Sequence, residues 1–299
     1  MDNKKVLLII NSVAGKLASH AALYDIVNTY CKKDWDVTVK ITQHRGHAKE
    51  LAAEAQKKEY DLIICCGGDG TMNEVLNGLL AENDCCSIPV GYIPAGSTND
   101  FAETLGISSD LSKSSFGITK ENTTLLDVGK FCENTYFSYI ASFGAFTAVS
   151  YDAPQDLKNT LGHFAYILQG VKDLSNLKPT KASVIADGVE YSGDFLFGSV
   201  SNTKSVAGIV KLKDNIVDLQ DGLFEVLLVR NPKDIVELNE ILIGATSSNF
   251  SSDMFVFLKA KEVSFHFSKS INWSLDGEKV KAGKDVTIVN LHEAVKLWK

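Results

Sequence analysis

The stretch that decides the fold is LIICCGGDGTMNE, which runs from Leu62 to Glu74 and joins an apolar run to three glycines around one carboxylate. The apolar run predicts a buried strand, and the residues from Thr71 onward carry apolar side chains at helical spacing. Glycines between a strand and a helix let the backbone approach a phosphate closely, and the helix N-terminus attracts negative charge. The stretch therefore predicts an α/β unit with an anion site at this turn.

The carboxylate of Asp69 does not fit a simple anion site, because it would repel phosphates. The conflict disappears if Asp69 acts through a divalent cation or takes a proton from an acceptor hydroxyl. Gly-Gly-Asp-Gly is also a common composition of a tight turn, and on the local sequence alone this simpler interpretation stays open. The flanking strand and helix, together with a second polar loop near Gly96, favour phosphoryl transfer.

Strands and helices alternate over the first 100 residues. This order predicts an open, mostly parallel sheet with helices on both faces, in which ligands bind beyond the carboxyl ends of the strands. Strands are expected at 6–10, 35–41, 60–65 and 88–93, with helices near Leu17 and at 46–58. The loops that follow these strands begin at Asn11, Thr42, Gly67 and Gly96, and we expect them to face one crevice with Asp100 on the same rim as Asp69.

The pattern changes near residue 125 to strands with few helices between them. Strands are expected at 125–129, 137–146, 182–186, 195–200 and 224–229, with clean alternation at 263–267 and 271–275. One helix, at 156–177, is expected to interrupt them. Its apolar stripe is most simply a core face, with a lipid-contacting face as the alternative. The second domain is therefore predicted to be an antiparallel β-sandwich.

Two Asp-Gly pairs lie in this second domain, Asp221-Gly222 and Asp276-Gly277. Asp-Gly is a strong signal for a hairpin turn, so each pair predicts one. The turn interpretation is compatible with a functional one. A hairpin tip can hold Glu278 rigidly over the crevice, and oxygens clustered around Asp221 can hold a hard cation such as Mg²⁺.

The composition narrows the classes of protein to consider. The chain has 299 residues, 45% of them hydrophobic, and a net charge of −7, which argues against nucleic acid as a partner. No apolar run approaches the ~20 residues of a membrane span, and the first strand lacks the cleavage site of a secretion signal. The six cysteines include adjacent pairs but no C-x-x-C, which favours reduced thiols in a cytosol.

Four motifs taken together resemble the diacylglycerol-kinase catalytic-domain family, and most of all its soluble bacterial lipid kinases, relatives of sphingosine and ceramide kinases. They are 67–74, 96–102, Asp221-Gly222 and Asp276-Gly277-Glu278, in matching order and spacing over nearly the whole chain. The resemblance implies an NAD kinase/diacylglycerol kinase-like fold and ATP-dependent phosphorylation of a lipid hydroxyl, in the first place diacylglycerol to phosphatidic acid. It implies a cytoplasmic enzyme in peripheral contact with the inner face of the membrane, and a homodimer is left open.

The resemblance also implies roles for individual residues. Glu278 matches a general base, and Asp69 and Asp100 match carboxylates that link the site to Mg²⁺, although whether Glu278 or Asp69 accepts the proton stays open. Asp221, with backbone oxygens of Asp218 and Leu223, matches a structural Mg²⁺ site. The implied ATP site comprises Asn11, Ser12, Val13, Ala14, Gly15, Thr42, Gly67, Gly68, Asp69, Gly70, Thr71, Met72, Asn73 and Ser97.

The expected domains are a nucleotide-binding domain at 1–125 and a lipid-substrate domain at 126–291, with 292–299 returning to the first. Two positions depart from the family pattern: Ser12 follows Asn11 where proline is usual, and few glycines follow Asn202. Two alternatives stay open. An NAD kinase-type enzyme shares the first motif, although the sequence 97–101 favours the lipid branch. A non-catalytic lipid-binding relative would keep the same fold.

Overall fold

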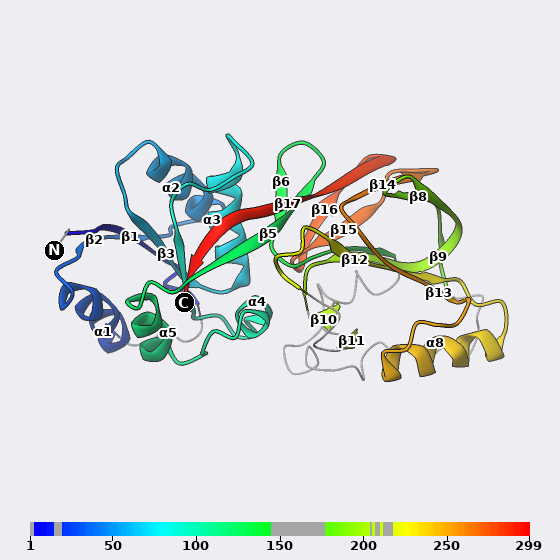
Figure 1. The fold of residues 1–299 in the computed structure, drawn as a ribbon, viewed down its shortest axis with the longest axis horizontal. Helices are drawn as coiled ribbons and strands as arrows, with labels where there is room; N and C mark the ends of the chain where they lie inside the picture. The colour runs from blue at the N-terminus through cyan, green and yellow to red at the C-terminus, as the bar shows by residue number, and fades with distance from the viewer. Residues whose placement is uncertain (1–2, 15–19, 145–176, 204, 207–209, 212–217) are drawn as a thin grey trace. The chain divides into compact units, whose positions relative to one another are not determined.

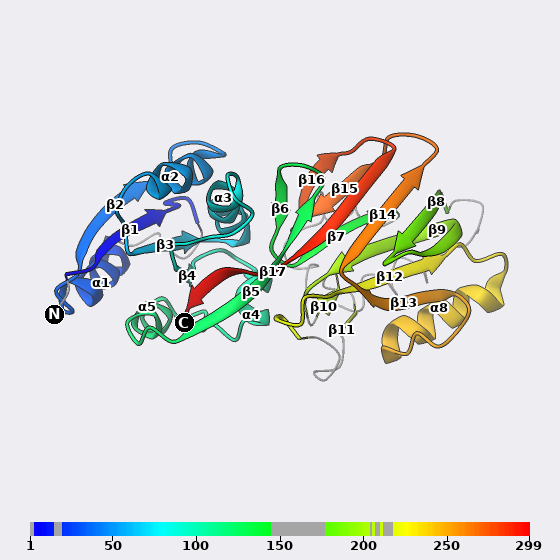
Figure 2. The same cartoon turned by 45° about the horizontal axis from the view of Figure 1, so that its top comes forward.

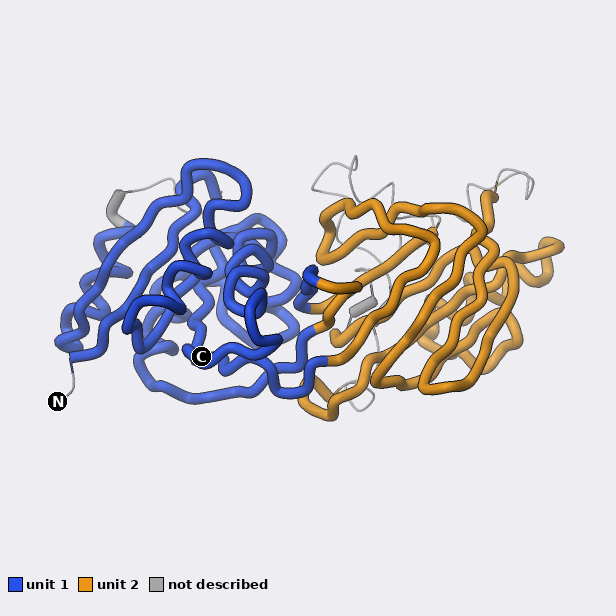
Figure 3. The backbone as a smooth tube through the Cα atoms, turned by 90° about the horizontal axis from the view of Figure 1, so that it is seen from above, with its two compact units in different colours: residues 1–128, 134–138, 291–299 blue, residues 129–133, 139–290 orange. Residues whose placement is uncertain are grey.

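A computed structural model describes residues 3–14, 20–144, 177–203, 205–206, 210–211 and 218–299 of the chain. The chain divides into two compact units, coloured separately in Figure 3. Unit 1 comprises 1–128, 134–138 and 291–299, and unit 2 comprises 129–133 and 139–290. Two strands, β5 (Thr123–Phe131) and β17 (Asp285–Trp298), contribute residues to both units.

Unit 1 contains a parallel sheet in the strand order β2-β1-β3-β4-β17. Helices cover both of its faces, α2 and α3 on one and α1 and α5 on the other, as Figure 1 shows. The fold class expected from alternating strands and helices is therefore confirmed. The elements of unit 1 are β1 (Lys5–Ile10), α1 (His20–Cys31), β2 (Asp36–Ile41), α2 (His47–Gln56), β3 (Leu62–Gly67), α3 (Asp69–Leu80), β4 (Val90–Pro94), α4 (Asp100–Thr104), α5 (Leu111–Ile118) and β6 (Thr135–Phe137).

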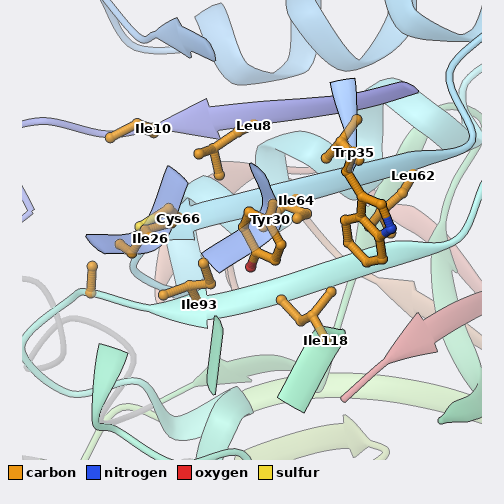
Figure 4. Close-up of a cluster of buried hydrophobic side chains, with 12 residues drawn as sticks. Leu8, Ile10, Ile26, Tyr30, Trp35, Leu62, Ile64, Cys66, Ile93 and Ile118 are labelled. Atoms are coloured by element: carbon orange, nitrogen blue, oxygen red, sulfur yellow. The ribbon is translucent and has the colours of Figure 1, made fainter. Parts of the chain in front are cut away.

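Alternate residues of β1 and β3 enter opposite cores, because successive side chains of a strand point to opposite faces. Leu8 and Ile64 lie in the cluster of Figure 4, with Tyr30 from α1 and Ile118 from α5. All four are fully buried. Because both faces of the strands are covered, the strands read as continuous apolar runs in the sequence, which is the pattern of a buried parallel sheet.

Helix α3 begins two residues earlier than the sequence pattern predicts, at Asp69 rather than Thr71. Gly68 caps it in an extended conformation, and Asp69 is the acidic residue of the first turn. A carboxylate in the first turn is favoured by the helix dipole, which explains why the helix includes the Asp-Gly pair instead of following it.

The strand pairs of unit 2 are all antiparallel in the part of the chain that the structure describes. Residues 197–201 of β9 pair with β7 on one edge and with β12 on the other, so β9 is a central strand. The antiparallel second domain expected from the sequence is confirmed. Its elements are β7 (Ile140–Gly144), β8 (Thr180–Ala186), β9 (Val189–Ser201), β10 (Ser205–Val206), β11 (Val210–Lys211), β12 (Phe224–Arg230), α8 (Ile235–Ser247), β13 (Phe255–Ala260), β14 (Glu262–Phe267), β15 (Asn272–Leu275) and β16 (Glu278–Lys281).

An aromatic cluster forms the core of unit 2. Phe143 of β7 lies with its ring centroid 4.9 Å from that of Trp273 and 5.6 Å from that of Phe265. Trp273 and Phe143 are fully buried. These rings come from alternate positions of β7, β14 and β15, as the alternating pattern of the last two strands predicted.

The sequence prediction missed helix α8, which runs beside β13 in Figures 1 and 2. Its cap carried a sequence signal: Asp234 accepts hydrogen bonds from the N–H groups of Val236 and Glu237, and Glu237 accepts one from Lys233 N–H. The helix predicted at 156–177 lies outside the described residues. None of the described helices has the length and apolar character needed to cross a bilayer.

Candidate active site

The predicted loops of unit 1 all follow carboxyl ends of parallel strands, and backbone hydrogen bonds join them. Asn11 follows β1, and its N–H donates to Cys66 O in β3 at 2.9 Å. Thr42 follows β2, and its N–H donates to Ile10 O at 2.8 Å. The N–H of Ala95 after β4 donates to Gly67 O at 2.8 Å. Each loop is thus fixed to its neighbour by the same sheet.

The two glycine motifs touch through Gly68 and Gly96. A Cβ added to Gly96 would lie 2.6 Å from the Cα of Gly68 and 2.7 Å from Oδ1 of Asn99. A Cβ on Gly68 would lie 3.3 Å from the Cα of Gly96. Glycine at position 96 is therefore required by packing, since any side chain there would push the two loops apart.

Asp69 fastens these loops together. Its Oδ1 accepts a hydrogen bond from the hydroxyl of Tyr92 at 3.0 Å, and its Oδ2 accepts one from the N–H of Asp100 at 2.8 Å. Asp100 is the first residue of α4, and its own side chain is exposed. Sequence reasoning placed Asp69 and Asp100 on one rim but missed Tyr92, which reads as a core residue of β4.

A second connection joins Asn11 to the glycine motif. Nδ2 of Asn11 donates to the hydroxyl of Thr71 at 3.0 Å, while Oδ1 accepts from the N–H of Val13 at 3.2 Å. The asparagine therefore orders both the loop after β1 and the first turn of α3. Because amide groups at a helix N-terminus attract anions, this arrangement can position a phosphate.

Glu74, the last residue of the first motif, holds the loop after β2. Its two carboxylate oxygens accept hydrogen bonds from Gly46 N–H at 2.8 Å and from Ala48 N–H at 3.2 Å, at the start of α2. Gly46 has a φ of 86°, a conformation that favours glycine. No role was predicted for Glu74 from the sequence. Its position at the end of the glycine motif was the only signal that it has one.

The remaining predicted nucleotide residues differ in exposure. Ser12, Val13 and Ser97 are exposed, whereas the side chain of Met72 is fully buried in the core, so only its backbone can face a ligand. Gly15 lies outside the described residues. The residues brought together in unit 1 are Asn11, Thr42, Gly67, Gly68, Asp69, Thr71, Gly96 and Asp100.

The Asp276-Gly277 pair forms the tight hairpin that the sequence predicted. Both residues have positive φ, 48° and 86°, and the turn joins the paired strands β15 and β16. The buried carboxylate of Asp276 accepts hydrogen bonds from the N–H groups of Tyr139 and Ile140, at 3.0 and 3.1 Å. The hairpin is thereby fixed to β7, and Glu278, exposed at the start of β16, stands on a rigid base.

The Asp221-Gly222 pair is a turn of another kind, so this hairpin prediction is wrong. The strand that follows it, β12, pairs with β13 on one edge and with β9 on the other, and neither is the segment that precedes the turn. Oδ1 of Asp221 accepts from the N–H of Leu223 at 3.0 Å, and Oδ1 of Asp218 accepts from that of Gln220 at 3.1 Å. Oδ2 of Asp221 accepts from Nζ of Lys259 at 2.6 Å. Backbone and ammonium donors therefore shape this loop.

Lys259 also faces Glu225, whose side chain is fully buried in β12. The ammonium nitrogen is 3.4 Å from Oε1 of Glu225. The register pairs Glu225 with Lys259 itself. Burial raises the pKa of Glu225 to about 7, and the Lys259 charge opposes that rise. This contact depends on strand register, so no local pattern in the sequence predicts it.

The sequence is similar to those of diacylglycerol kinases. The diacylglycerol kinase catalytic domain model matches residues 5–131. The diacylglycerol kinase of Bacillus subtilis strain 168 is 31% identical over 276 residues, covering 92% of this chain and 90% of that protein. That of Staphylococcus haemolyticus strain JCSC1435 is 31% identical, covering 91% and 81%.

A solved structure agrees with these sequences. A Bacillus anthracis strain Sterne protein assigned to the diacylglycerol kinases matches with a TM-score of 0.81 and 26% identity, over 99% of this chain and 95% of that one. The likeness thus extends through both units rather than stopping at the glycine motifs. The chain belongs to the diacylglycerol kinase family and is a lipid kinase.

Proposed function

We propose that this lipid kinase transfers the γ-phosphoryl group of ATP to the hydroxyl of diacylglycerol, giving phosphatidic acid. Membership of the family implies ATP as the donor and a lipid as the acceptor. The observation that carries the proposal is the contact of the two glycine loops at Gly68 and Gly96, locked by Asp69. Phosphoryl transfer depends mainly on positioning and electrostatics, and rigid loops at strand ends supply the first of these.

The nucleotide would bind along the strand-end loops of unit 1. Asn11 and Thr71 are already fixed to each other, and the N-terminus of α3 offers positive dipole charge to a phosphate. Ser12, Val13, Ala14, Thr42, Gly67, Gly70, Asn73 and Ser97 would complete this surface, with Gly15 beyond the described residues. We accordingly propose that residues 1–125 and 292–299 form the nucleotide-binding domain and that residues 126–291 form the lipid-substrate domain.

The proposed catalytic metal is Mg²⁺, associated with Asp69 and Asp100. Hard oxygen ligands suit Mg²⁺, and the exposed carboxylate of Asp100 can reach a hydrated ion. Asp69, whose carboxylate accepts hydrogen bonds from Tyr92 and from the N–H of Asp100, would hold Asp100 in place beside that ion. When bound, Mg²⁺ neutralises charge on the phosphates of ATP.

At the proposed structural Mg²⁺ site of Asp218, Asp221 and Leu223, the ammonium group of Lys259 competes with the ion. The residue types fit, but Nζ of Lys259 holds Oδ2 of Asp221 at 2.6 Å. An ion that used this oxygen would have to displace the ammonium group, which would then retain Glu225 as its partner. We therefore expect weak Mg²⁺ binding at this loop.

Glu278 is the proposed general base. It is exposed at the start of β16, beside a hairpin fixed by Asp276 to the backbone of β7. A carboxylate on a rigid element can be held within hydrogen-bond reach of an acceptor hydroxyl. In the proposed reaction Glu278 accepts the hydroxyl proton as the oxygen attacks the γ-phosphorus.

The acceptor resides in a bilayer, so we also propose peripheral contact with the inner face of the membrane by a cytoplasmic enzyme. Helix α8 supports this proposal, because Ile235, Val236 and Ile243 are 60%, 62% and 66% exposed on it. Insertion of such side chains into the boundary between headgroups and acyl chains is favourable in proportion to the apolar area buried. Two other candidates for membrane contact in the sequence are the lysines Lys204, Lys211 and Lys213 and the helix predicted at 156–177. Both lie outside the residues whose side chains are described.

The test is a phosphotransfer assay with labelled ATP and Mg²⁺, with diacylglycerol in mixed micelles, a panel of other lipid alcohols, and NAD. We expect labelled phosphatidic acid. Labelled product only from NAD would contradict the lipid assignment, and bound lipid with no consumption of ATP on any alcohol would indicate a carrier. Turnover of another lipid alcohol alone would retain the kinase and reject diacylglycerol.

A further inference from the structure

A group of potential metal-ligating side chains lies outside the proposed site, in the turn after β2 and the first turn of α2. His44, His47 and Glu50 each offer a ligand atom, and these atoms all lie within 4.8 Å of one another. It is the one such group of three or more among the residues that the structure describes. His47 and Glu50 lie three residues apart in the first turn of α2, and His44 lies before the helix, in the turn that follows β2.

The distances suit a small metal ion. Nε2 of His44 is 3.8 Å from Oε2 of Glu50. Two atoms that share one Zn²⁺ ion, each about 2.1 Å from it, are at most about 4.2 Å apart. The two imidazole rings are stacked, with centroids 4.7 Å apart and planes 11° apart. Because the lone pair of an imidazole nitrogen lies in the plane of its ring, two stacked rings do not point at one ion as they stand. Binding therefore requires one imidazole to rotate, and the exposed side chain of His44 has the freedom to do so.

The hydrogen bonds of the two imidazoles differ in what they leave for a metal. Nδ1 of His44 lies 3.1 Å from the carbonyl oxygen of Arg45, to which it can only donate, so its Nε2 keeps a lone pair for an ion. A carbonyl partner on the second ring nitrogen is the usual support of a metal-bound histidine. Nδ1 of His47 instead accepts from Gln43 N–H at 3.0 Å. His47 must exchange that bond for the metal, which limits the affinity.

The backbone beneath the group is already ordered. Glu74 accepts hydrogen bonds from Gly46 and Ala48, the residues on either side of His47. The turn that carries the ligands is therefore held to helix α3, which begins with the glycine motif. A metal here would cross-link the start of α2 and would stiffen a loop that begins at Thr42.

We propose that His44, His47 and Glu50 form a binding site for a transition metal ion of the Zn²⁺ type. Imidazole nitrogen is a preferred ligand for Zn²⁺, whereas Mg²⁺ takes oxygen ligands. Three protein ligands leave a fourth position to water, so the site is open and exchanges its ion with solution. The site is separate from the metal proposed for phosphoryl transfer, and it does not depend on the proposed function.

The test measures Zn²⁺ binding by competition with a chromophoric chelator, in the presence of Mg²⁺. Because thiols also bind zinc, the three exposed cysteines, Cys31, Cys85 and Cys132, are first replaced by serine. We expect one equivalent of Zn²⁺, and at least about tenfold weaker binding in His44→Ala and in Glu50→Gln. His266→Ala is the matched control, since His266 is an exposed histidine with a carboxylate partner, Asp285, at 2.6 Å in unit 2.

Hydrogen exchange of residues 42–50 gives a second readout that needs no activity. Zn²⁺ should slow exchange there in the background that lacks the three exposed cysteines and in His266→Ala, and should leave it unchanged in His44→Ala. The proposal is overturned by zinc binding that survives both His44→Ala and Glu50→Gln, by zinc binding lost in His266→Ala, by displacement of zinc by millimolar Mg²⁺, or by the absence of bound zinc.

Discussion

Replacing Lys259 with methionine should destabilise unit 2 in a pH-dependent way. The substitution keeps the length of the side chain and removes the ammonium group that lies 2.6 Å from Asp221 and 3.4 Å from Glu225. Glu225 is fully buried, and within the described residues its Oε2 has no hydrogen-bond donor. Loss of the lysine therefore leaves a buried carboxyl group with nothing to balance its charge.

The direction of the pH dependence follows from the pKa of Glu225, which burial raises from 4.5 to about 7. A carboxyl group with a raised pKa favours the folded state when it is protonated. This contribution is complete below pH 4.5 and is lost as the pH rises toward 7. Without Lys259 the pKa rises further, so the loss continues above pH 7.

The magnitude comes from the cost of an uncompensated buried charge, reduced because Lys259 is one-third exposed. We expect the free energy of unfolding to fall by about 2 to 3 kcal/mol at pH 8.5. At pH 5.5, where Glu225 is mostly protonated, we expect a fall of about 1 kcal/mol or less. The difference between these two values is the quantity to measure.

Urea denaturation at pH 5.5 and 8.5, followed by tryptophan fluorescence and circular dichroism, measures both values. Trp273 is the reporter within unit 2, where it lies in the aromatic core. The double variant Lys259→Met, Glu225→Gln should recover much of the loss at pH 8.5. Equal destabilisation of Lys259→Met at both pH values would refute the reasoning, as would a double variant less stable than the single one.

Three further perturbations address the proposed site and membrane contact. Gly96→Ala should lower kcat/KM about 10- to 100-fold, because its Cβ would lie 2.6 Å from the Cα of Gly68. Gly117→Ala is the control, because its Cβ would lie 3.4 Å from the nearest atom. Equal effects of the two substitutions would contradict the packing argument. Asp69→Asn should abolish the Mg²⁺-dependent activity, since the new amide NH₂ would face either Tyr92 or the N–H of Asp100. Tyr92→Phe should reduce the activity less, and a normal Mg²⁺ response of Asp69→Asn would reject the proposed role of Asp69. Ile243→Asp should weaken sedimentation with phospholipid vesicles by about tenfold or more, and Ile185→Asp, on an exposed position of β8, should not; unchanged binding of Ile243→Asp excludes α8.

Much of the fold follows from patterns that are local in sequence. The apolar run 62–66 is buried on both faces, so it had to belong to a covered parallel sheet. Asp276 and Gly277 form a tight hairpin because both accept positive φ. The capping residues Asp234 and Glu237 were a readable signal for α8, and the prediction of one helix passed over it.

Contacts between distant residues were beyond local reasoning. The hydrogen bond from the hydroxyl of Tyr92 to Asp69 requires that β3 and β4 be neighbours in the sheet. The contact of the Lys259 ammonium with Glu225 requires the observed register of β12 and β13. A single sequence specifies neither, since a shift of one residue would turn each side chain to the opposite face. The sequence could therefore suggest which residues carry the chemistry, but it could not show which distant side chains contact them and fix their positions.

We propose that Glu278 accepts the proton when this lipid kinase moves a phosphoryl group from ATP to a lipid hydroxyl. The decisive experiment uses Glu278→Gln, assayed for single-turnover formation of phosphatidic acid and, separately, for ATP binding by calorimetry. We predict a loss of about 100-fold or more in the rate, with ATP affinity unchanged. A Glu278→Gln enzyme that makes phosphatidic acid at the normal rate would contradict the account.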